Sequence, residues 1–286
     1  MSKHEQQQRD DHREDEQEPD HQHEQHEDQQ LERPTIDVVA AAGGWPQPWP
    51  NVAELAEVLP SDRWTLVGGL MTQLHTIHRG IGVVRPTNDV DIVLHIETSR
   101  GVPSQTARAL ESIGYRLLPA VDPRTNTAHR FVRGASQVDL VTTDEVIDVL
   151  MADHPAPSVL ETLRGRKMVP IAGGTQALRR TINARLQLVP GALTTISVPR
   201  PFAALILKAA AYHADSRAPG RHLNDAAALL ACIEDPIAER DNFAGSDRSR
   251  LMTLDRALPD DHDAWLLLPP DVRDEAQAAL RLLCAP

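Results

Sequence analysis

The sequence predicts an α+β fold, in which a mixed sheet is flanked by helices and followed by a mainly helical C-terminal part. In the first half of the chain, short apolar runs of strand length alternate with segments of helical periodicity, and Gly-containing turns separate them. In the second half, longer helical patterns prevail, of which PRPFAALILKAAAYHADS is the clearest. This order of elements favours a mixed sheet with helices packed against it. At 286 residues, the chain is also long enough to bury a sizeable core.

The individual elements follow from local patterns. Runs of β-branched and aliphatic residues predict strands at 63–67, 90–96, 115–121, 129–134, 136–143, 179–189 and 194–199. Helical periodicity predicts helices at 51–59, 70–79, 104–114, 144–152, 157–164, 199–216, 224–235 and 270–284. The helix at 104–114 is expected to begin with a Ser cap and to end at Gly114. Gly173-Gly174 is expected to form a hairpin or loop turn.

Composition divides the chain into four regions. Residues 1–33 are rich in Gln, Glu, Asp and His and almost lack aliphatic residues, which predicts a disordered tail. Residues 34–60 are interpreted as a Pro/Trp linker with a short helix, 61–198 as the α/β core and 199–286 as the helical C-terminal region. The tail holds twelve Asp and Glu against four Lys and Arg, so the rest of the chain is only mildly acidic. The net charge of −12 therefore does not exclude a nucleotide or nucleic-acid partner.

Two further features suggest where the protein works. Cys232 and Cys284 are the only cysteines, and their spacing is not that of a metal or redox pair, which favours a reducing compartment. No run of about 18 apolar residues is present, and the N-terminus lacks the pattern of a secretory signal. We expect a cytoplasmic protein with no membrane partner.

The stretch RPTNDVDIVL places two acids where a strand begins. Asp89 and Asp91 are two residues apart, so on a strand their carboxylates lie on one face, ~6–7 Å apart. Such a pair is costly unless a positive group lies between the two, and Mg²⁺ supplies that charge and prefers carboxylate oxygens. The alternative is a solvated strand end with two surface acids.

Two other features favour the site interpretation. Asp139 interrupts the apolar run SQVDLVTT, and if this strand lies beside the first, three carboxylates converge as two-metal phosphoryl chemistry requires. Gly68-Gly69 lies between a predicted strand and a predicted helix, where backbone amides can cradle a phosphate. A glycine pair alone would be weak evidence, since any tight strand–helix turn can use it.

The stretch VGGLMTQLHTIHRGIGVVRPTNDVDIVL resembles the signature of the nucleotidyltransferase fold of the polymerase-β type, and in particular the AbiEii/AbiGii toxin family, which includes the MenT toxins. That family's pattern is a glycine pair opening a helix, followed by Arg-x-Thr-x-Asp-x-Asp entering a strand. The positions that match it are Gly68, Gly69, Arg85, Thr87, Asp89 and Asp91. Asp139 matches the family's third Asp, Lys208 a Lys on a later helix, and Asp225 a downstream Asp. The match covers about residues 62–235, so it identifies region 61–198 as a nucleotidyltransferase core.

Two of these positions also have interpretations of their own. Lys208 is one of three lysines among 29 Lys and Arg, and it lies in an apolar helix, which favours a selected compact charge over a snorkelling side chain. Asp225 could equally be an acid in the first turn of its helix, with Asn224 as the cap. Arg130 and Arg133 could meet a triphosphate or an RNA backbone, but a solvated strand face is the favoured interpretation. His75 and His78 are interpreted as packing or surface residues rather than ligands.

The resemblance implies a metal-dependent transfer of a nucleoside monophosphate from an NTP to an acceptor hydroxyl. Asp89, Asp91 and Asp139 would bind Mg²⁺ or Mn²⁺, and Asp139 would be the general base. The glycine amides, Arg85 and Lys208 would neutralise the phosphates. The implied acceptor is the 3′ end of tRNA, in a toxin–antitoxin system with an antitoxin encoded nearby. The alternatives are nucleotidylation of a small molecule such as an antibiotic, nucleotidylation of a protein, and a catalytically inactive scaffold that binds nucleotide.

Overall fold

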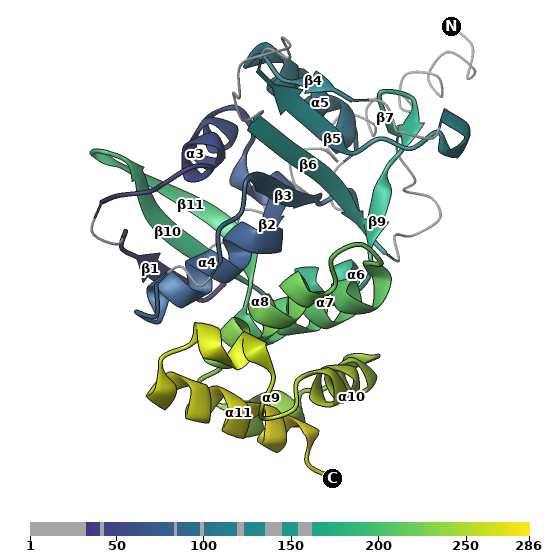
Figure 1. The fold of residues 1–286 in the computed structure, drawn as a ribbon. Coiled ribbons are helices and arrows are strands. Elements are labelled where there is room, and N and C mark those ends of the chain that lie inside the picture. Colours follow the sequence, from purple (N-terminus) through teal and green to yellow (C-terminus); the bar gives the residue numbers. More distant parts are fainter. Residues whose placement is uncertain are drawn as a thin grey trace, which may run out of the picture. The chain divides into compact units, whose positions relative to one another are not determined.

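A mixed β-sheet is the centre of the fold (Figure 1). The computed structural model describes residues 33–40, 43–82, 85–97, 100–118, 123–134, 145–153 and 162–286. The sheet strands in chain order are β1 (Thr35–Val38), β2 (Trp64–Val67), β3 (Asp89–Leu94), β4 (Arg116–Leu117), β5 (Arg130–Arg133), β6 (Glu145–Ala152), β9 (Val169–Ile171), β10 (Thr181–Val189) and β11 (Ala192–Pro199). Their order in space is β1-β10-β11-β2-β3-β6-β5-β4, and β9 pairs with the end of β6. A separate small ladder joins β7 (Thr162–Leu163) to β8 (Arg166–Lys167).

The pairing of β3 decides where the acidic residues lie. On one side, β3 runs antiparallel to β2, with Val67 opposite Asp91. On the other side it runs parallel to β6, and this register places Asp91 beside Asp148. Because the side chains of directly paired residues lie on the same face of a sheet, this register brings acids from two strands together.

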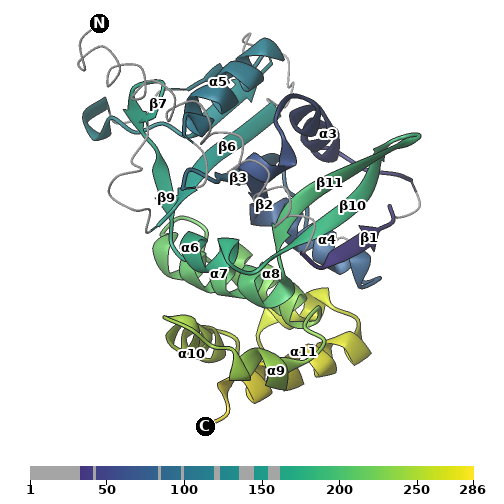
Figure 2. The same cartoon turned by 180° about the vertical axis from the view of Figure 1, so that it is seen from behind.

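Helices pack on the sheet and at one end of it. Those in the first part of the chain are α3 (Trp49–Val58), α4 (Gly68–His78) and α5 (Val102–Ser112). Those in the second part are α6 (Gly174–Leu178), α7 (Pro201–Ala214), α8 (Gly220–Leu230), α9 (Pro236–Asp241), α10 (Asp247–Ala257) and α11 (Pro270–Cys284), with short 3₁₀ turns at 61–63, 123–125 and 263–267. Helix α4 contacts β1, β2 and β3, whereas α3 contacts β10 and β11. Helices α7 to α11 gather at one end of the sheet, which is visible from both sides (Figure 1 and Figure 2).

The core runs through both parts. Its largest fully buried side chains include Trp49, Trp64, Phe131, Phe202 and Trp265. Each of the three indoles donates a hydrogen bond, from Trp49 to the Gln73 side chain and from the other two to backbone carbonyls. Residues 35–286 form one compact unit. The predicted α+β class, with a mixed sheet flanked by helices and a helical C-terminal part, is thus confirmed.

Several predicted elements agree with the structure. The predicted strands at 63–67, 90–96, 129–134, 179–189 and 194–199 correspond to β2, β3, β5, β10 and β11, and the helices at 70–79, 199–216 and 270–284 to α4, α7 and α11. The predicted strand at 136–143, which contains Asp139, lies outside the described residues. So do most of the predicted helix at 157–164 and nearly all of the N-terminal tail. The end of that helix, at 162–163, is strand β7.

The prediction of a helix at 144–152 is wrong, because residues 145–152 form β6. The run EVIDVLMA is rich in β-branched residues and lies between β3 and β5, and residues 147–149 are all buried. A short apolar run buried on both faces has no clear period, so sequence alone does not separate strand from helix there.

Two helix boundaries also differ from the prediction. Helix α8 begins at Gly220, four residues before the predicted start, so Asn224 is not its cap. Gly101 rather than a serine precedes α5, because its left-handed backbone and Pro103 in the first turn start the helix earlier. Gly173 lies in the loop turn between β9 and the short helix α6, in agreement with the prediction of a hairpin or loop turn. Among the described residues, no helix is both long enough and apolar enough to span a bilayer.

His75 on α4 is a packing residue, as predicted. Its ring is buried, and Nε2 donates a hydrogen bond to the carbonyl of Pro199 at 2.7 Å. Burial lowers the pKa of His75 to about 4, even though the bond to Pro199 acts in the opposite direction. The folded state therefore holds this ring neutral at pH values at which the unfolded chain protonates it.

We expect His75 to lower the unfolding free energy as the pH drops from about 6.5 towards 4, because the unfolded state then binds a proton that the folded state does not bind. Between pH 7 and pH 5 the wild type should lose about 2 kcal/mol more unfolding free energy than His75→Gln, which keeps a donor for Pro199. Urea denaturation at both pH values measures this. Equal losses in the two proteins would contradict it.

Candidate functional site

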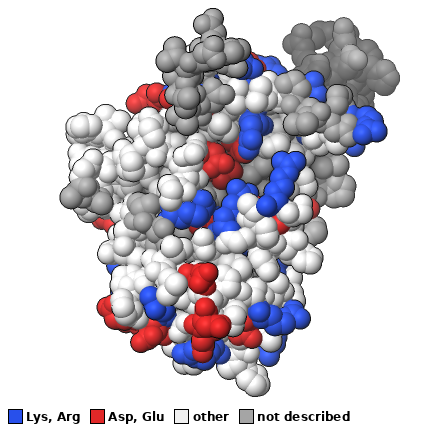
Figure 3. Space-filling model, in the orientation of Figure 1, with Lys and Arg blue, Asp and Glu red and all other residues white. Residues whose placement is uncertain are grey.

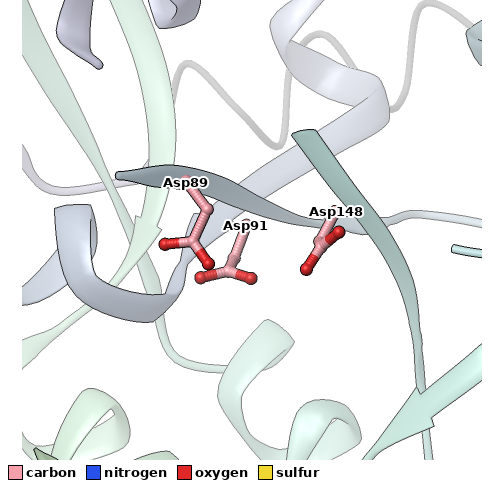
Figure 4. Close-up of side chains that lie close together, drawn as sticks. All are labelled: Asp89, Asp91 and Asp148. Atoms are coloured by element: carbon pink, nitrogen blue, oxygen red, sulfur yellow. The ribbon is translucent and has the colours of Figure 1, made fainter. Parts of the chain in front are cut away.

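Three carboxylates meet on one face of the central sheet. Asp89 and Asp91 project from β3, and Asp148 projects from the parallel neighbour β6 (Figure 4). One oxygen from each lies within 4.8 Å of the others. The two acids predicted from RPTNDVDIVL therefore do share a face, and a third acid joins them there.

Their mutual repulsion is visible in the pKa of Asp91. Burial, together with the charges of Asp89 and Asp148, raises the pKa of Asp91 to about 7, against the opposing effect of Lys208 and Arg221. A cluster of this kind is costly for the protein to hold without a cation.

Asp148 is the acid that sequence reasoning missed. It interrupts the apolar run EVIDVLMA, which is the same signal that drew attention to Asp89, Asp91 and Asp139. The prediction of a helix for that run hides the signal, because a single acid in a helix is unremarkable. Asp139 lies outside the described residues, and its predicted role stays a prediction.

The glycine pair lies against this cluster and has no room for a side chain. Gly68 opens α4 with a φ of +70°, and a Cβ there would lie 1.8 Å from Oδ2 of Asp91. At Gly69 a Cβ would lie 2.7 Å from the side chain of Thr87. No side chain caps α4, so its first amides, which have no partner within the helix, are left at the edge of the site.

Thr87 and Arg85 lie on the loop that leads into β3. The Thr87 hydroxyl donates a hydrogen bond to Oδ1 of Asp89 at 2.7 Å, which orients that carboxylate. The backbone carbonyl of Arg85 accepts a hydrogen bond from Gln73 on α4. The same Gln73 accepts the bond from Trp49, so the core holds this loop in place.

Asp225 joins the two predicted phosphate-binding cations. Its carboxylate accepts two hydrogen bonds from the Arg85 guanidinium, each of 3.0 Å, and lies 2.7 Å from Nζ of Lys208. Burial alone would raise the pKa of Asp225, but Lys208 and Arg85 together lower it below its usual range. Both Asp225 and Lys208 are almost fully buried, which excludes the snorkelling alternative for Lys208. Asp225 lies in the second turn of α8, so it is not an acid of the first turn.

All predicted site residues that the structure describes, except Asp225, line one cleft of about 680 Å³. Asp225 lies behind Lys208 and Arg85, which do line it. The cleft also exposes Arg130 and Arg221, and an apolar wall formed by β6, β9, the β9–α6 loop and α7 (Leu150, Pro170, Ile171, Ala172, Leu207 and Ala211). Figure 3 shows an acidic patch with Lys and Arg side chains around it. Arg130 is exposed, as a solvated strand face predicts, and it also lines this cleft and pairs with Asp148.

The donor set fits a divalent cation of the oxygen-binding class. Mg²⁺ and Mn²⁺ prefer carboxylate ligands, and the three carboxylates are close enough to contact one ion or two adjacent ions. The raised pKa of Asp91 indicates that the cluster lacks positive charge, which such an ion would supply.

Comparison with known proteins yields one structural similarity. The chain is similar to an antigenic nucleotidyltransferase-like protein from Paracoccidioides brasiliensis, with 16% identity and a TM-score of 0.48, over 80% of this chain and 92% of that chain. No family model matches the sequence, and no curated protein does.

We expect Gly68→Ala to displace Asp91 and weaken Mn²⁺ binding at least ~10-fold, because the new Cβ would overlap Oδ2 of Asp91. Gly80→Ala is the matched control. Gly80 follows the other end of α4 with a φ of +79°, and nothing lies within 4 Å of a Cβ built there. Both variants should lose about 1–2 kcal/mol from backbone strain, but only Gly68→Ala should lose metal affinity in a calorimetric titration. Equal affinities would show that the glycine is needed for its backbone alone.

Asp225→Asn should lower the unfolding free energy by about 3–5 kcal/mol, because it leaves the buried Lys208 ammonium without a carboxylate. Adding Lys208→Met should recover more than half of this loss, since it removes the stranded charge. Asp241→Asn, on the exposed end of α9, is the control for charge change. A loss under about 1 kcal/mol for Asp225→Asn would contradict this account of the buried pair.

Proposed function

We propose that this protein is a metal-dependent nucleotidyltransferase that moves a nucleoside monophosphate from an NTP to an acceptor hydroxyl. The observation that carries the proposal is the meeting of Asp89, Asp91 and Asp148 on two parallel strands, in a cleft that also contains helix-terminal amides and a buried lysine. Carboxylates at this spacing are suited to binding cations that contact phosphates.

The acidic cluster and the phosphate-binding residues of the cleft each have a role in this reaction. Asp89 and Asp91 would hold a divalent cation, which offsets charge on the triphosphate when it is bound. The acceptor oxygen attacks the α-phosphorus, the bond to the pyrophosphate oxygen breaks, and Asp148 accepts the hydroxyl proton. The Gly68 and Gly69 amides, Arg85 and Lys208 neutralise the departing pyrophosphate. Catalysis of this kind consists mostly of positioning and of charge neutralisation.

Asp225 acts through its neighbours in this proposal. Its carboxylate pairs with both Arg85 and Lys208 and so holds these two cations next to each other at the cleft. It is therefore a positioning residue and does not contact the reacting atoms. Asp139, the base predicted from the sequence, remains a candidate for a further carboxylate at the acceptor hydroxyl.

The acceptor is proposed from the resemblance in the sequence to the AbiEii/AbiGii toxins. It points to the 3′ end of tRNA, and to a toxin restrained by an antitoxin encoded nearby. The arginines of the cleft agree with a polyanionic acceptor, since guanidinium groups bind phosphates well. Nucleotidylation of an antibiotic or a protein uses the same chemistry, so the acceptor has to be found by experiment.

The test is incubation of the full chain with each α-labelled NTP, Mg²⁺ and total tRNA. We expect label on the RNA, reduced ~100-fold or more in Asp89→Asn and in Asp148→Asn, because each removes a carboxylate of the cluster. Asp241→Asn should remain active, because its carboxylate lies on α9 and does not line the cleft.

The place where label appears separates the proposed function from its rivals. Label on the protein would indicate protein nucleotidylation, and label on an added aminoglycoside would indicate antibiotic modification. Folded wild type that binds NTP but labels nothing would favour the inactive scaffold. Equal labelling by wild type and Asp89→Asn would rule out the cleft as the catalytic site.

A further inference from the structure

The three acids of the cluster are not equally available to a cation. Among the described residues, no hydrogen bond reaches either oxygen of Asp91, and Asp89 accepts only the bond from Thr87. Both oxygens of Asp148, in contrast, accept hydrogen bonds from Arg130. Asp89 and Asp91 are thus open to a cation, whereas Asp148 is already paired with Arg130.

The pairing of Arg130 with Asp148 is fixed by the sheet. The two residues are direct cross-strand partners on β5 and β6. Nε and Nη2 of Arg130 donate to the two carboxylate oxygens at 2.8 and 2.7 Å, the parallel bidentate arrangement in which guanidinium and carboxylate interact most strongly. Asp148, together with the nearby Asp89 and Asp91, raises the pKa of Arg130, so the guanidinium stays charged at any working pH.

Arg130 is also placed to leave this pair. Its side chain is 46% exposed, whereas that of Asp148 is 8% exposed, so the carboxylate is fixed and the guanidinium reaches the cleft. A planar guanidinium binds phosphate as readily as carboxylate. A substrate phosphate in the cleft is therefore a natural competitor for Arg130.

We infer that Arg130 takes the place of a second divalent cation at Asp148, so that the protein without substrate holds one divalent ion, between Asp89 and Asp91. This inference rests on the proposed function for its cation site. Asp148 becomes available to a second ion, or to the acceptor proton, when a substrate phosphate draws Arg130 away. Arg130 then has two successive roles, as the counter-charge of Asp148 and as a phosphate ligand.

The test is a calorimetric titration of the full chain with Mn²⁺ alone, followed by electron paramagnetic resonance to count bound ions. The wild type should bind one ion. Arg130→Gln, which removes the charge and keeps most of the side-chain length, should bind a second ion or bind the first at least ~10-fold more tightly. Arg130→Lys keeps the charge without the two-pronged geometry, and it should still bind one ion.

Arg116→Gln is the matched control, since Arg116 is an exposed residue of the neighbouring strand β4 and does not line the cleft. It should bind Mn²⁺ as the wild type does. Binding of two ions by the wild type without substrate would overturn the inference. So would weaker or unchanged binding by Arg130→Gln, which would show that Arg130 only orients Asp148.

The titration involves no turnover, so its outcome is separable from that of the labelling assay. A protein that transfers no nucleotide but gains an ion in Arg130→Gln would reject the proposed function and keep this inference. If the wild type transfers nucleotide and Arg130→Gln binds Mn²⁺ as the wild type does, the proposed function is supported and this inference is rejected.

Discussion

The parallel pairing of β3 with β6 sets the constraint on which the rest of the site depends, because it brings Asp89, Asp91 and Asp148 within 4.8 Å of one another. Like charges at this distance, partly withdrawn from water, oppose folding. The surrounding chain reduces that cost at two of the acids, because Thr87 donates to Asp89 and Arg130 pairs with Asp148. The pKa of Asp91, in contrast, stays raised. Asp91 is thus the position at which the charge is least compensated, and where an external cation would stabilise the fold most.

The basic residues of the cleft also need counter-charges, and the chain supplies them. A buried ammonium such as that of Lys208 needs a counter-charge, and Asp225 supplies it while also holding Arg85. The cleft therefore contains an acidic cluster whose charge is only partly compensated and a basic group that has its own counter-charge. A nucleoside triphosphate with its metal ion carries both signs of charge and complements both groups.

The supporting core explains how these groups keep their positions. Helix α4 starts at the glycine pair, packs on β2 and β3, and through Gln73 ties the buried Trp49 to the backbone of Arg85. The first glycine is required for two reasons at once, because its φ is positive and because Asp91 occupies the space that a side chain would fill. The loop carrying Arg85 and Thr87 is therefore anchored at both ends, by the core and by the acidic cluster, as a preorganised site requires.

The sequence by itself determined the α+β class, the strand that carries Asp89 and Asp91, and the helix that carries Lys208. These depend on local patterns: an apolar run interrupted by acids, a glycine pair between strand and helix, and a rare lysine in an apolar helix. Only the tertiary structure decided which third acid joins the pair, because strand neighbours are set by long-range pairing that leaves no local trace, and EVIDVLMA suits a buried strand and a helix equally well. It also decided the partners of Asp225 and Arg130. Asp225 pairs with Arg85, which is distant in sequence, and Arg130 pairs with Asp148 on the neighbouring strand. These partners matter because a buried charge without a counter-charge is costly.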